Sequence, residues 1–249
     1  MSAAGQIKVG VVGARGRMGQ TVIQAVSSAD DLVLAAAVDQ GDDINLVNDC
    51  DVVVDFTTPS VVMPTLQHCI EQGVHCVVGT TGFDDGRLAQ LQAWLSSKPG
   101  VGVLIAPNFG VGAVLMMQFA QLAAPYFESV EIIELHHPDK VDAPSGTARR
   151  TAELIGAVRS DRGVAKSPDA TSQELQGARG ASVNDVRVHS VRARGLVAHQ
   201  EVIFGGVGET LTIRHDSMDR TSFMPGVLLG IRSVAKHPGL TVGLDSYLD

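Results

Sequence analysis

The chain has 249 residues, of which 45% are hydrophobic and 18% are charged, with a formal net charge of −8. This composition is typical of a folded protein of one large or two modest domains, and it excludes an intrinsically disordered chain. The acidic balance gives no basic stripe for general nucleic-acid binding, and no apolar run is long enough to span a membrane.

The first half of the chain alternates short apolar runs with helical segments. We expect strands at 7–12, 32–38, 51–56, 75–79 and 101–106, and helices at 16–27, 60–72 and 84–97. Continuous Val and Ile runs joined by helical crossovers are typical of a parallel sheet covered on both faces. Because such crossovers are right-handed, the pattern predicts a doubly wound, Rossmann-type domain.

A glycine-rich turn, Gly13-Ala14-Arg15-Gly16-Arg17-Met18-Gly19, joins the first expected strand to the first helix. Glycines let such a turn approach a pyrophosphate, which then faces the N–H groups that begin the helix. Asp39 ends the second strand, where its carboxylate can accept hydrogen bonds from ribose hydroxyls. Arg15 and Arg17 can attract the 2′-phosphate of NADP, unless they are solvated surface residues, whereas Asp39 favours NAD. The sequence therefore leaves the choice of cofactor open.

Two further loops follow expected strands, Gly79-Thr80-Thr81-Gly82 and Ala106-Pro107-Asn108-Phe109. In an open parallel sheet, ligands bind beyond the carboxyl ends of the strands. Each loop alone also fits an ordinary turn. Together with the turn at 13–19, they outline one crevice for a dinucleotide.

The pattern changes after Asn108. We expect a strand at 130–135, three β-rich runs at 186–191, 195–204 and 209–215, and helices at 112–126, 147–158 and 223–236. Consecutive β runs without helices predict an antiparallel or mixed sheet, and hence a second, α+β domain. Residues 159–185 are rich in Ser, Asp, Gly and Pro and indicate a long loop, and the tail at 240–249 can return to the first domain. We expect a dinucleotide-binding domain at 1–107, completed by 219–249, and a substrate-binding domain at 108–218.

The segment ELHHPDKVDAPSGTA, residues 134–148, concentrates polar chemistry at the end of an expected strand. His136 and His137 should point to opposite sides there, and histidine is suited to deliver a proton near neutral pH. Lys140 can hold an anion or polarise an imine, and Ser145 resembles the N-cap of a helix whose N–H groups can bind a carboxylate. No third His or Cys completes a metal site, so we expect no metal. Taken alone, the two histidines also fit an ordinary polar strand end.

Cysteine usage and the N-terminus bear on the compartment. The three cysteines are Cys50, Cys69 and Cys76, an odd number without CxxC spacing. We therefore expect reduced thiols used as small apolar residues, and a cytoplasmic protein. The start MSAAGQIKVG leads almost directly into an apolar run, so we expect no signal or transit peptide.

The run HHPDKVDAPSGT, from His136 to Thr147, resembles the signature of the dihydrodipicolinate reductase family, the 4-hydroxy-tetrahydrodipicolinate reductases of bacterial lysine synthesis. Further matches occur in the family's order, namely VGARGRMG at 12–19, DFT at 55–57, VGTTGF at 78–83 and APNF at 106–109. The resemblance implies a homotetramer, assembled through the sheet of the second domain. It also implies reduction of a cyclic dicarboxylate in the diaminopimelate pathway with NADH, NADPH or both.

Carried over by position, the resemblance implies roles for individual residues. His136 would be the proton donor and Lys140 the second catalytic group. The substrate would be bound by His137, Ser145, Gly146 and Thr147. The cofactor site would be lined by Gly13, Ala14, Arg15, Gly16, Arg17, Met18, Asp39, Gly79, Thr80, Thr81, Ala106, Pro107, Asn108 and Phe109. Gln40 stands where some family members have a basic residue that binds the 2′-phosphate, so cofactor preference stays open.

Three other functions compete with this interpretation. Another dehydrogenase of a small acidic substrate would share the glycine turn but usually lacks the KVDAPSGT run. A redox-sensing, nucleotide-binding regulator would need a DNA- or partner-binding surface, and neither the charge nor a helix-turn-helix pattern indicates one. A structural tetramer without catalysis would not need both His136 and Lys140.

Overall fold

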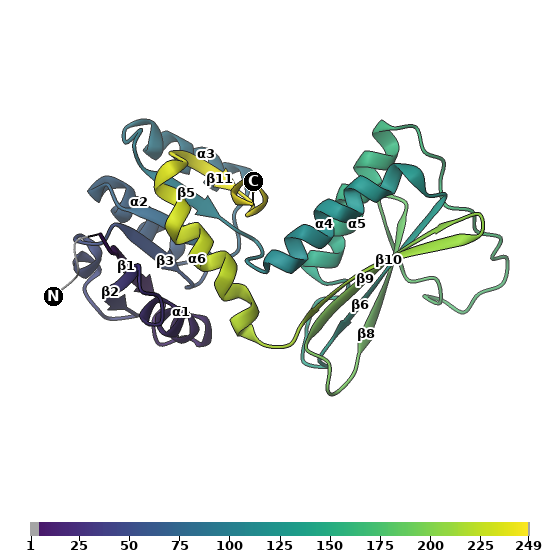
Figure 1. Cartoon of the computed structure of the whole chain (residues 1–249), viewed down its shortest axis with the longest axis horizontal. Helices are drawn as coiled ribbons and strands as arrows, with labels where there is room; N and C mark the ends of the chain where they lie inside the picture. Colours follow the sequence, from purple (N-terminus) through teal and green to yellow (C-terminus); the bar gives the residue numbers. More distant parts are fainter. Residues whose placement is uncertain (1–4, 249) are drawn as a thin grey trace. The chain divides into compact units, whose positions relative to one another are not determined.

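The computed structural model describes residues 5–248 (Figure 1). These residues fall into two units, one formed by the chain up to Val111 together with the chain from Arg220 onward, and the other by Gly112–Asp219. We call them the first and the second unit. Among the described residues, no helix combines the length and the apolar character needed to cross a membrane.

The first unit is built on a parallel sheet of six strands in the order β11-β5-β4-β3-β1-β2. The strands are β1 (Ile7–Val12), β2 (Leu32–Val38), β3 (Val52–Asp55), β4 (His75–Val78), β5 (Gly102–Ile105) and β11 (Gly239–Val242). The helices are α1 (Arg17–Ser27), α2 (Val62–Gln72), α3 (Asp85–Ser96) and α6 (Met224–Ser233), and α1 packs beside α6 and α2 beside α3. The expected Rossmann-type sheet is confirmed.

Burial explains why these strands read as continuous apolar runs. Every residue of β3 and β5 is buried, as are the last four of β1, because helices cover both faces of the sheet. The strand order reverses between β1 and β3, so the connections that follow these strands diverge. Ligands of doubly wound proteins bind at such a reversal, beyond the carboxyl ends of the strands.

The C-terminal part of the chain completes this sheet. A 3₁₀ turn, η3 (Arg220–Phe223), leads into α6, and η4 (Val234–Lys236) follows it. The single helix expected at 223–236 is thus an α-helix that ends in a 3₁₀ turn. β11 then pairs in parallel with β5, so the C-terminal part of the chain adds a sixth strand to the sheet of the first unit. Short 3₁₀ turns also occur at η1 (Ile44–Val47) and η5 (Asp245–Tyr247).

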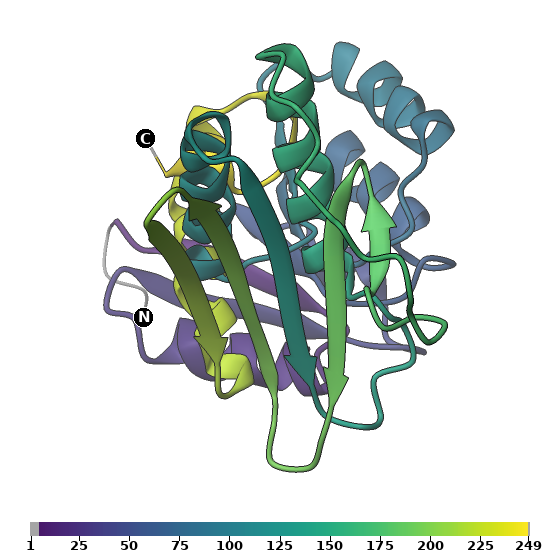
Figure 2. The ribbon, with the colours of Figure 1, turned by 90° about the vertical axis from the view of Figure 1, so that its right-hand side faces the viewer.

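The second unit contains a mixed sheet of five strands in the order β10-β9-β6-β8-β7, which Figure 2 shows face on. The strands are β6 (Ser129–His136), β7 (Ala181–Val183), β8 (Val186–Arg192), β9 (Ala198–Gly206) and β10 (Glu209–Ser217). β6 and β8 run parallel, whereas the other pairs are antiparallel. The expected α+β domain with a mixed sheet is confirmed.

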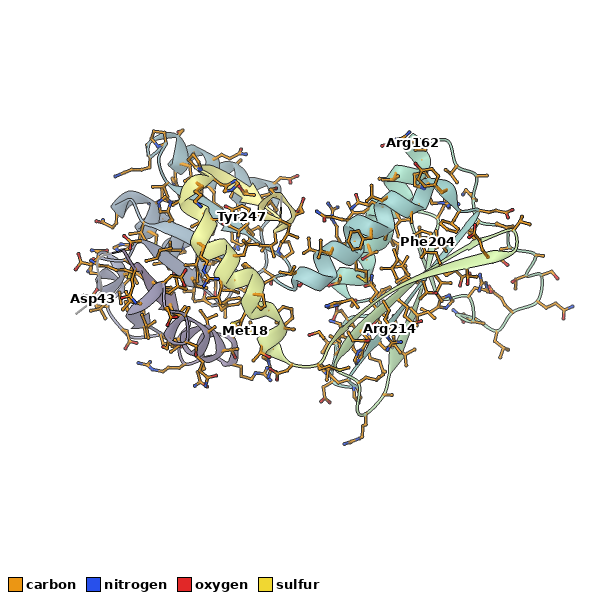
Figure 3. All side chains as sticks on the ribbon, viewed as in Figure 1. Met18, Asp43, Arg162, Phe204, Arg214 and Tyr247 are labelled. Atoms are coloured by element: carbon orange, nitrogen blue, oxygen red, sulfur yellow. The ribbon has the colours of Figure 1, made fainter. Side chains whose placement is uncertain are left out.

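One face of this sheet packs against α4 (Val111–Ala123), the 3₁₀ turn η2 (Ala124–Tyr126) and α5 (Gly146–Asp161). Phe204 of β9 is fully buried in the core between them, with its ring centroid 5.5 Å from that of Phe127 (Figure 3). Along β6, Val130, Ile132 and Glu134 are buried, whereas the alternate residues are only half-buried. A carboxylate therefore lies on the core side of the strand.

The prediction of one long loop over residues 159–185 is wrong at both ends of that range. α5 continues to Asp161, and the buried guanidinium of Arg159 in its last turn donates hydrogen bonds to the carbonyl oxygens of Ala124, Phe127, Glu128 and Ala165. At the other end, β7 forms a hairpin with β8. Its two-residue turn is Asn184-Asp185, with φ values of 47° and 65°. Asn and Asp tolerate this left-handed conformation, so the pair was a hairpin signal in the sequence.

Candidate active site

The turn at 13–19 is packed too closely for side chains at two of its glycines. Gly13 has a φ of +83°, and a Cβ there would lie 2.4 Å from the carbonyl oxygen of Phe56. A Cβ on Gly19 would lie 2.1 Å from the carbonyl oxygen of Gly13. α1 begins next to Gly16, and no side chain caps it. A helix N-terminus without a side-chain cap, beside bare backbone, fits a pyrophosphate.

Asp39 lies directly after β2 and is fixed by the glycine turn. Its carboxylate accepts hydrogen bonds from the Arg15 amide at 2.6 Å and from the Gln40 amide at 2.8 Å. The bond from the Arg15 amide, followed by that from Gln40, lowers the pKa of Asp39. The carboxylate is therefore ionised at neutral pH and is oriented as an acceptor beside the turn.

The Arg15 guanidinium is paired with Asp42, a residue that the sequence analysis did not single out. Its Nη2 lies 2.8 and 2.9 Å from the two carboxylate oxygens of Asp42. Asp42 also accepts from the Asp39 amide at 2.9 Å, and this bond, with that from Arg15, lowers its pKa. The positive charge expected to attract a 2′-phosphate is thus matched by a carboxylate on the same loop. A second acidic residue three positions after Asp39 was the available signal.

A cavity of about 720 Å³ opens where the strand order reverses, within the size range of small-molecule sites. Three of the residues expected at the cofactor site line it, namely Gly13, Gly16 and Asp39. The other lining residues end β1 and β2, follow β2 and β3, or belong to η1 or α2. They are Val12, Val38, Gln40, Gly41, Asp42, Ile44, Phe56, Thr57, Thr58, Ser60, Val61, Pro64, Thr65 and His68. This cavity suits the adenosine half of a dinucleotide.

The loops at 79–81 and 106–109 do not line this cavity, but both reach Phe56, which does. A Cβ on Gly79 would lie 2.0 Å from the Phe56 ring, and the Phe109 ring centroid lies 5.8 Å from that of Phe56. Both loops continue adjacent strand ends, since the amides of Gly79 and Ala106 donate to β3 and β4. The structure thus brings the three predicted cofactor segments to one edge of the sheet.

The remaining predicted cofactor residues occupy this edge in different ways. Ala14 is buried, and its amide donates to the carbonyl oxygen of Val38 at 3.1 Å. Asn108 accepts from the Gly110 amide at 2.8 Å. The residues Arg17, Thr81 and Pro107 are exposed, and Met18 is half-buried.

Thr80 is fixed by a buried carboxyl group at the end of β3. The Asp55 side chain is fully buried, and its Oδ1 accepts from the hydroxyls of Thr80 at 2.6 Å and Thr57 at 2.8 Å and from the Thr57 amide at 3.0 Å. Burial raises the pKa of Asp55 against the opposing effect of these hydrogen bonds. Asp55 therefore ties together two loops of the cofactor edge.

In the second unit, His136 ends β6 beside the buried Glu134. The Nδ1 atom of His136 lies 2.5 Å from Oε2 of Glu134, a side chain with 0% exposure. Burial lowers the pKa of His136, the Glu134 carboxylate opposes that effect, and Lys140 and Arg192 add to it. Histidine in this setting has one ring nitrogen fixed by a carboxylate.

Arg192 of β8 binds the same carboxylate with two hydrogen bonds. Its Nη1 lies 2.8 Å from Oε2 and its Nη2 2.8 Å from Oε1 of Glu134, and Nη2 also donates to the carbonyl oxygen of Asp142 at 2.7 Å. The Ser145 amide donates to Oε1 at 3.2 Å. Burial on its own raises the pKa of Glu134, but hydrogen bonds from Arg192, Ser190 and His136 outweigh it and lower the pKa to about 2. Glu134 is therefore ionised at neutral pH.

The other predicted residues follow in the loop and at the start of α5. Nζ of Lys140 donates to Asp142 at 2.6 Å. Ser145 is the N-cap of α5, as predicted, and its hydroxyl accepts from the Ala148 amide at 3.2 Å. Gly146 is the first residue of α5 and Thr147 follows it, while the His137 side chain is exposed.

Three residues of this cluster were missed by the sequence analysis, namely Glu134, Asp142 and Arg192. For Glu134 a signal existed, because the alternation along β6 puts it on the same face as Val130 and Ile132. Asp142 lies within the recognised motif. Arg192 lies 58 residues beyond Glu134, and only the pairing of β6 with β8 brings it there.

A parallel sheet with a glycine turn at the start of α1 and an ionised carboxylate beside that turn is typical of one class of proteins, the nicotinamide-nucleotide-binding dehydrogenases and reductases. Comparison with known protein families then shows which family within this class the chain matches. Residues 7–109 match the family described as dihydrodipicolinate reductase, N-terminus, and residues 112–248 match dihydrodipicolinate reductase, C-terminus. The chain belongs to the dihydrodipicolinate reductase family.

Individual relatives agree over the whole length. The chain is 64% identical over 245 residues to the 4-hydroxy-tetrahydrodipicolinate reductase of Nocardia farcinica, which covers 98% of this chain and 99% of the relative. It is 66% identical over 243 residues to the enzyme of the same name from Thermobifida fusca, covering 97% and 99%. A solved structure of dipicolinate-bound dihydrodipicolinate reductase from Paenisporosarcina sp. TG-14 superposes with a TM-score of 0.86 at 41% identity, covering 97% of this chain and 99% of that one.

Proposed function

We propose that this protein catalyses the NADH- or NADPH-dependent reduction of 4-hydroxy-tetrahydrodipicolinate to tetrahydrodipicolinate, in the diaminopimelate route to lysine. The observation that carries the proposal is the clustering of the HHPDKVDAPSGT segment around one buried carboxylate, at the start of a helix. A proton carrier, a cation and a helix N-terminus suit a small dianionic imine. Family membership supports the same activity.

In this reaction the substrate gains a hydride and a proton and loses water, while the nicotinamide is oxidised by two electrons. The bound cofactor supplies the hydride. His136 donates the proton to the carbon or nitrogen that becomes basic. Lys140 stabilises the negative charge that develops, and the first residues of α5 bind one substrate carboxylate. Ser145, Gly146 and Thr147 bind this carboxylate at the start of α5, where the Ser145 hydroxyl also caps the helix.

The proposal also covers the domain boundaries, the compartment, the oligomeric state and the role of His137. The dinucleotide-binding domain comprises 1–107 with 219–249, and the substrate-binding domain comprises 108–218, boundaries that lie near the borders of the two units. The protein works in the cytoplasm as a homotetramer, and His137 contributes to substrate binding. Support for assembly through the sheet comes from apolar side chains that its strands leave partly exposed, including Val191 and Leu211.

One assay tests the activity. The purified protein is given the condensation product of aspartate semialdehyde and pyruvate, and loss of reduced-nicotinamide absorbance is followed with NADH and with NADPH. We expect oxidation that requires both precursors. A control without pyruvate measures background oxidation. Absence of oxidation with either nucleotide would refute the proposed function.

For the cofactor, we propose that both nucleotides are used and that NADH is preferred. Asp39 is ionised and would repel a 2′-phosphate, and Asp42 neutralises the nearby Arg15 guanidinium. These two carboxylates act in the same direction, so removal of one should weaken the preference without abolishing nucleotide binding.

Asp42→Asn is expected to shift the ratio of kcat/KM for NADPH to that for NADH upward by about fivefold, because the change removes one negative charge near the 2′-phosphate and leaves the Arg15 guanidinium uncompensated. The asparagine oxygen can still accept from the Asp39 amide, so the loop keeps its shape. The measurement is steady-state kinetics with each nucleotide at low and high salt, since screening should reduce the shift. Asp43→Asn on the same loop is the control, because Asp43 caps η1 instead of pairing with Arg15. An unchanged ratio would contradict the role of Asp42.

A further inference from the structure

Glu134 is the point at which three segments of the second unit meet, namely β6, the loop between β6 and α5, and β8. Its two oxygens accept hydrogen bonds from the His136 ring, the Arg192 guanidinium and the Ser145 amide, and Arg192 also holds the carbonyl of Asp142. The side chain is fully buried. An ionised carboxylate is rarely buried unless it is paired and hydrogen-bonded, and here every partner belongs to or adjoins the predicted catalytic segment.

We propose that Glu134, paired with Arg192, is a positioning residue that fixes the ring of His136 so that Nε2 delivers the proton to the substrate. This inference rests on the proposed role of His136 as proton donor and deepens it, since it names the nitrogen that acts and the residues that select it.

The tautomer follows from the acceptor. An ionised carboxylate can only accept, so the Nδ1 of His136 must carry a hydrogen when it lies 2.5 Å from Oε2. In the imidazolium form Nε2 also carries a hydrogen, and this is the proton available for transfer. When the Nε2–H bond breaks and the new bond to the substrate forms, the ring returns to the neutral Nδ1–H tautomer, which Glu134 still holds. The ring regains its proton from solvent before the next turnover.

Arg192 has a distinct part in this arrangement. Two parallel N–H···O bonds from one guanidinium set the plane of the carboxylate, which a single-point cation cannot do. Through its bond to the Asp142 carbonyl, Arg192 also holds the loop whose Asp142 side chain binds Lys140. The proton donor and the cation are therefore positioned by the same ion pair.

The charges that face His136 define the expected pH effect. Glu134 on β6 favours the imidazolium, whereas Lys140 on the loop and Arg192 on β8 disfavour it; β9 contributes the uncharged Ala198 opposite His136. Removing the Glu134 charge leaves only the two cations and the effect of burial, so the pKa of His136 should fall. A reaction that needs the imidazolium should then lose activity at a lower pH than in the wild type.

The first test is Glu134→Gln, with Glu131→Gln as the matched control. Both glutamates lie on β6 and each pairs with one arginine and one histidine, but Glu131 binds Arg179 and His189 on the other face of the strand. The amide nitrogen that replaces one carboxylate oxygen in Glu134→Gln cannot accept a hydrogen bond from the histidine or from the arginine. We expect kcat for the proposed reaction to fall about 10- to 100-fold, the range typical of residues that orient a functional ligand.

We also expect the pH at which kcat declines to move down by about one unit in Glu134→Gln, while the Kd for NADH stays unchanged. Glu131→Gln should match the wild type in both measurements. Turnover by the wild type in the same assay separates the two hypotheses. If the wild type shows no turnover, the proposed function fails. If the wild type is active and Glu134→Gln is equally active with an unshifted pH profile, the positioning role is overturned.

A second measurement needs no variant at Glu134. The ¹⁵N chemical shifts of the histidine rings report which nitrogen is protonated, and comparison with His136→Gln assigns the signals of His136. Above its pKa, His136 in the wild type should be the Nδ1–H tautomer. The Nε2–H tautomer at this position would refute the proposal, whatever the activity of the variants.

Discussion

Replacing His136 with glutamine is expected to lower kcat for the proposed reaction by about 10²- to 10⁴-fold, the usual contribution of a positioned general acid. Glutamine preserves polarity and approximate size at the end of β6 but has no proton to give near neutral pH. The Kd for NADH should change by less than about twofold, because His136 belongs to the second unit, whereas the residues that line the nucleotide cavity all belong to the first.

The measurements are steady-state kinetics at saturating NADH and a fluorescence titration of NADH binding. His189→Gln is the matched control, since His189 also lies in the sheet of the second unit with a glutamate at 2.7 Å, but that glutamate is Glu131. The control should retain wild-type turnover. A His136→Gln variant with unchanged kcat would exclude this residue as the proton donor.

The strands of the first unit could be predicted because strands that are buried on both faces consist of continuous apolar residues. β1 and β2 have the bounds expected from their apolar runs, Ile7–Val12 and Leu32–Val38. Helix ends were less accurate where the chain tightens into 3₁₀ turns, as at Val234–Lys236. Such turns depend on packing against the sheet, which the periodicity of the sequence does not record.

The candidate site was predictable only where its chemistry is local. The motif itself brought His136, Lys140 and Ser145 together, and the N-cap role of Ser145 followed from its position before a helical segment. Glu134, whose carboxylate binds His136 and Ser145, could be found only by noticing that it alternates in phase with buried valine and isoleucine along β6. Arg192 could not be found this way, because its place beside Glu134 depends on strand pairing.

In the glycine turn, too, the sequence predicted local features but not the contacts that depend on the folded loop. Spacing of glycines indicated a close approach of backbone, and the structure gives the distance that makes it necessary, 2.1 Å between a Cβ at Gly19 and the Gly13 carbonyl oxygen. The Arg15–Asp42 pair is local in sequence but depends on a loop conformation that composition does not determine. The sequence therefore left cofactor preference open, and the proposed preference for NADH rests on the carboxylate partner of Arg15.

Gly19→Ala is expected to weaken NADH binding by about 10- to 100-fold, because overpacking a tight contact costs about 1–3 kcal/mol. The added methyl group meets three atoms of one backbone peptide unit, namely the Gly13 carbonyl oxygen at 2.1 Å, its carbon at 2.8 Å and Ala14 Cα at 2.9 Å. Backbone cannot rotate away as a side chain would, so α1 must move from the turn. The N–H groups at the start of the helix then no longer meet the pyrophosphate.

The readouts are the Kd for NADH by titration calorimetry and the ¹⁵N tautomer state of His136. Gly100→Ala is the control, because a Cβ there meets nothing within 4 Å and its φ is not in the left-handed region. We expect Gly19→Ala to lose nucleotide affinity while the His136 ring keeps its Nδ1–H tautomer, since Glu134, Arg192 and Ser145 belong to the other unit. Wild-type affinity in Gly19→Ala would mean that the cofactor pyrophosphate does not bind at this turn.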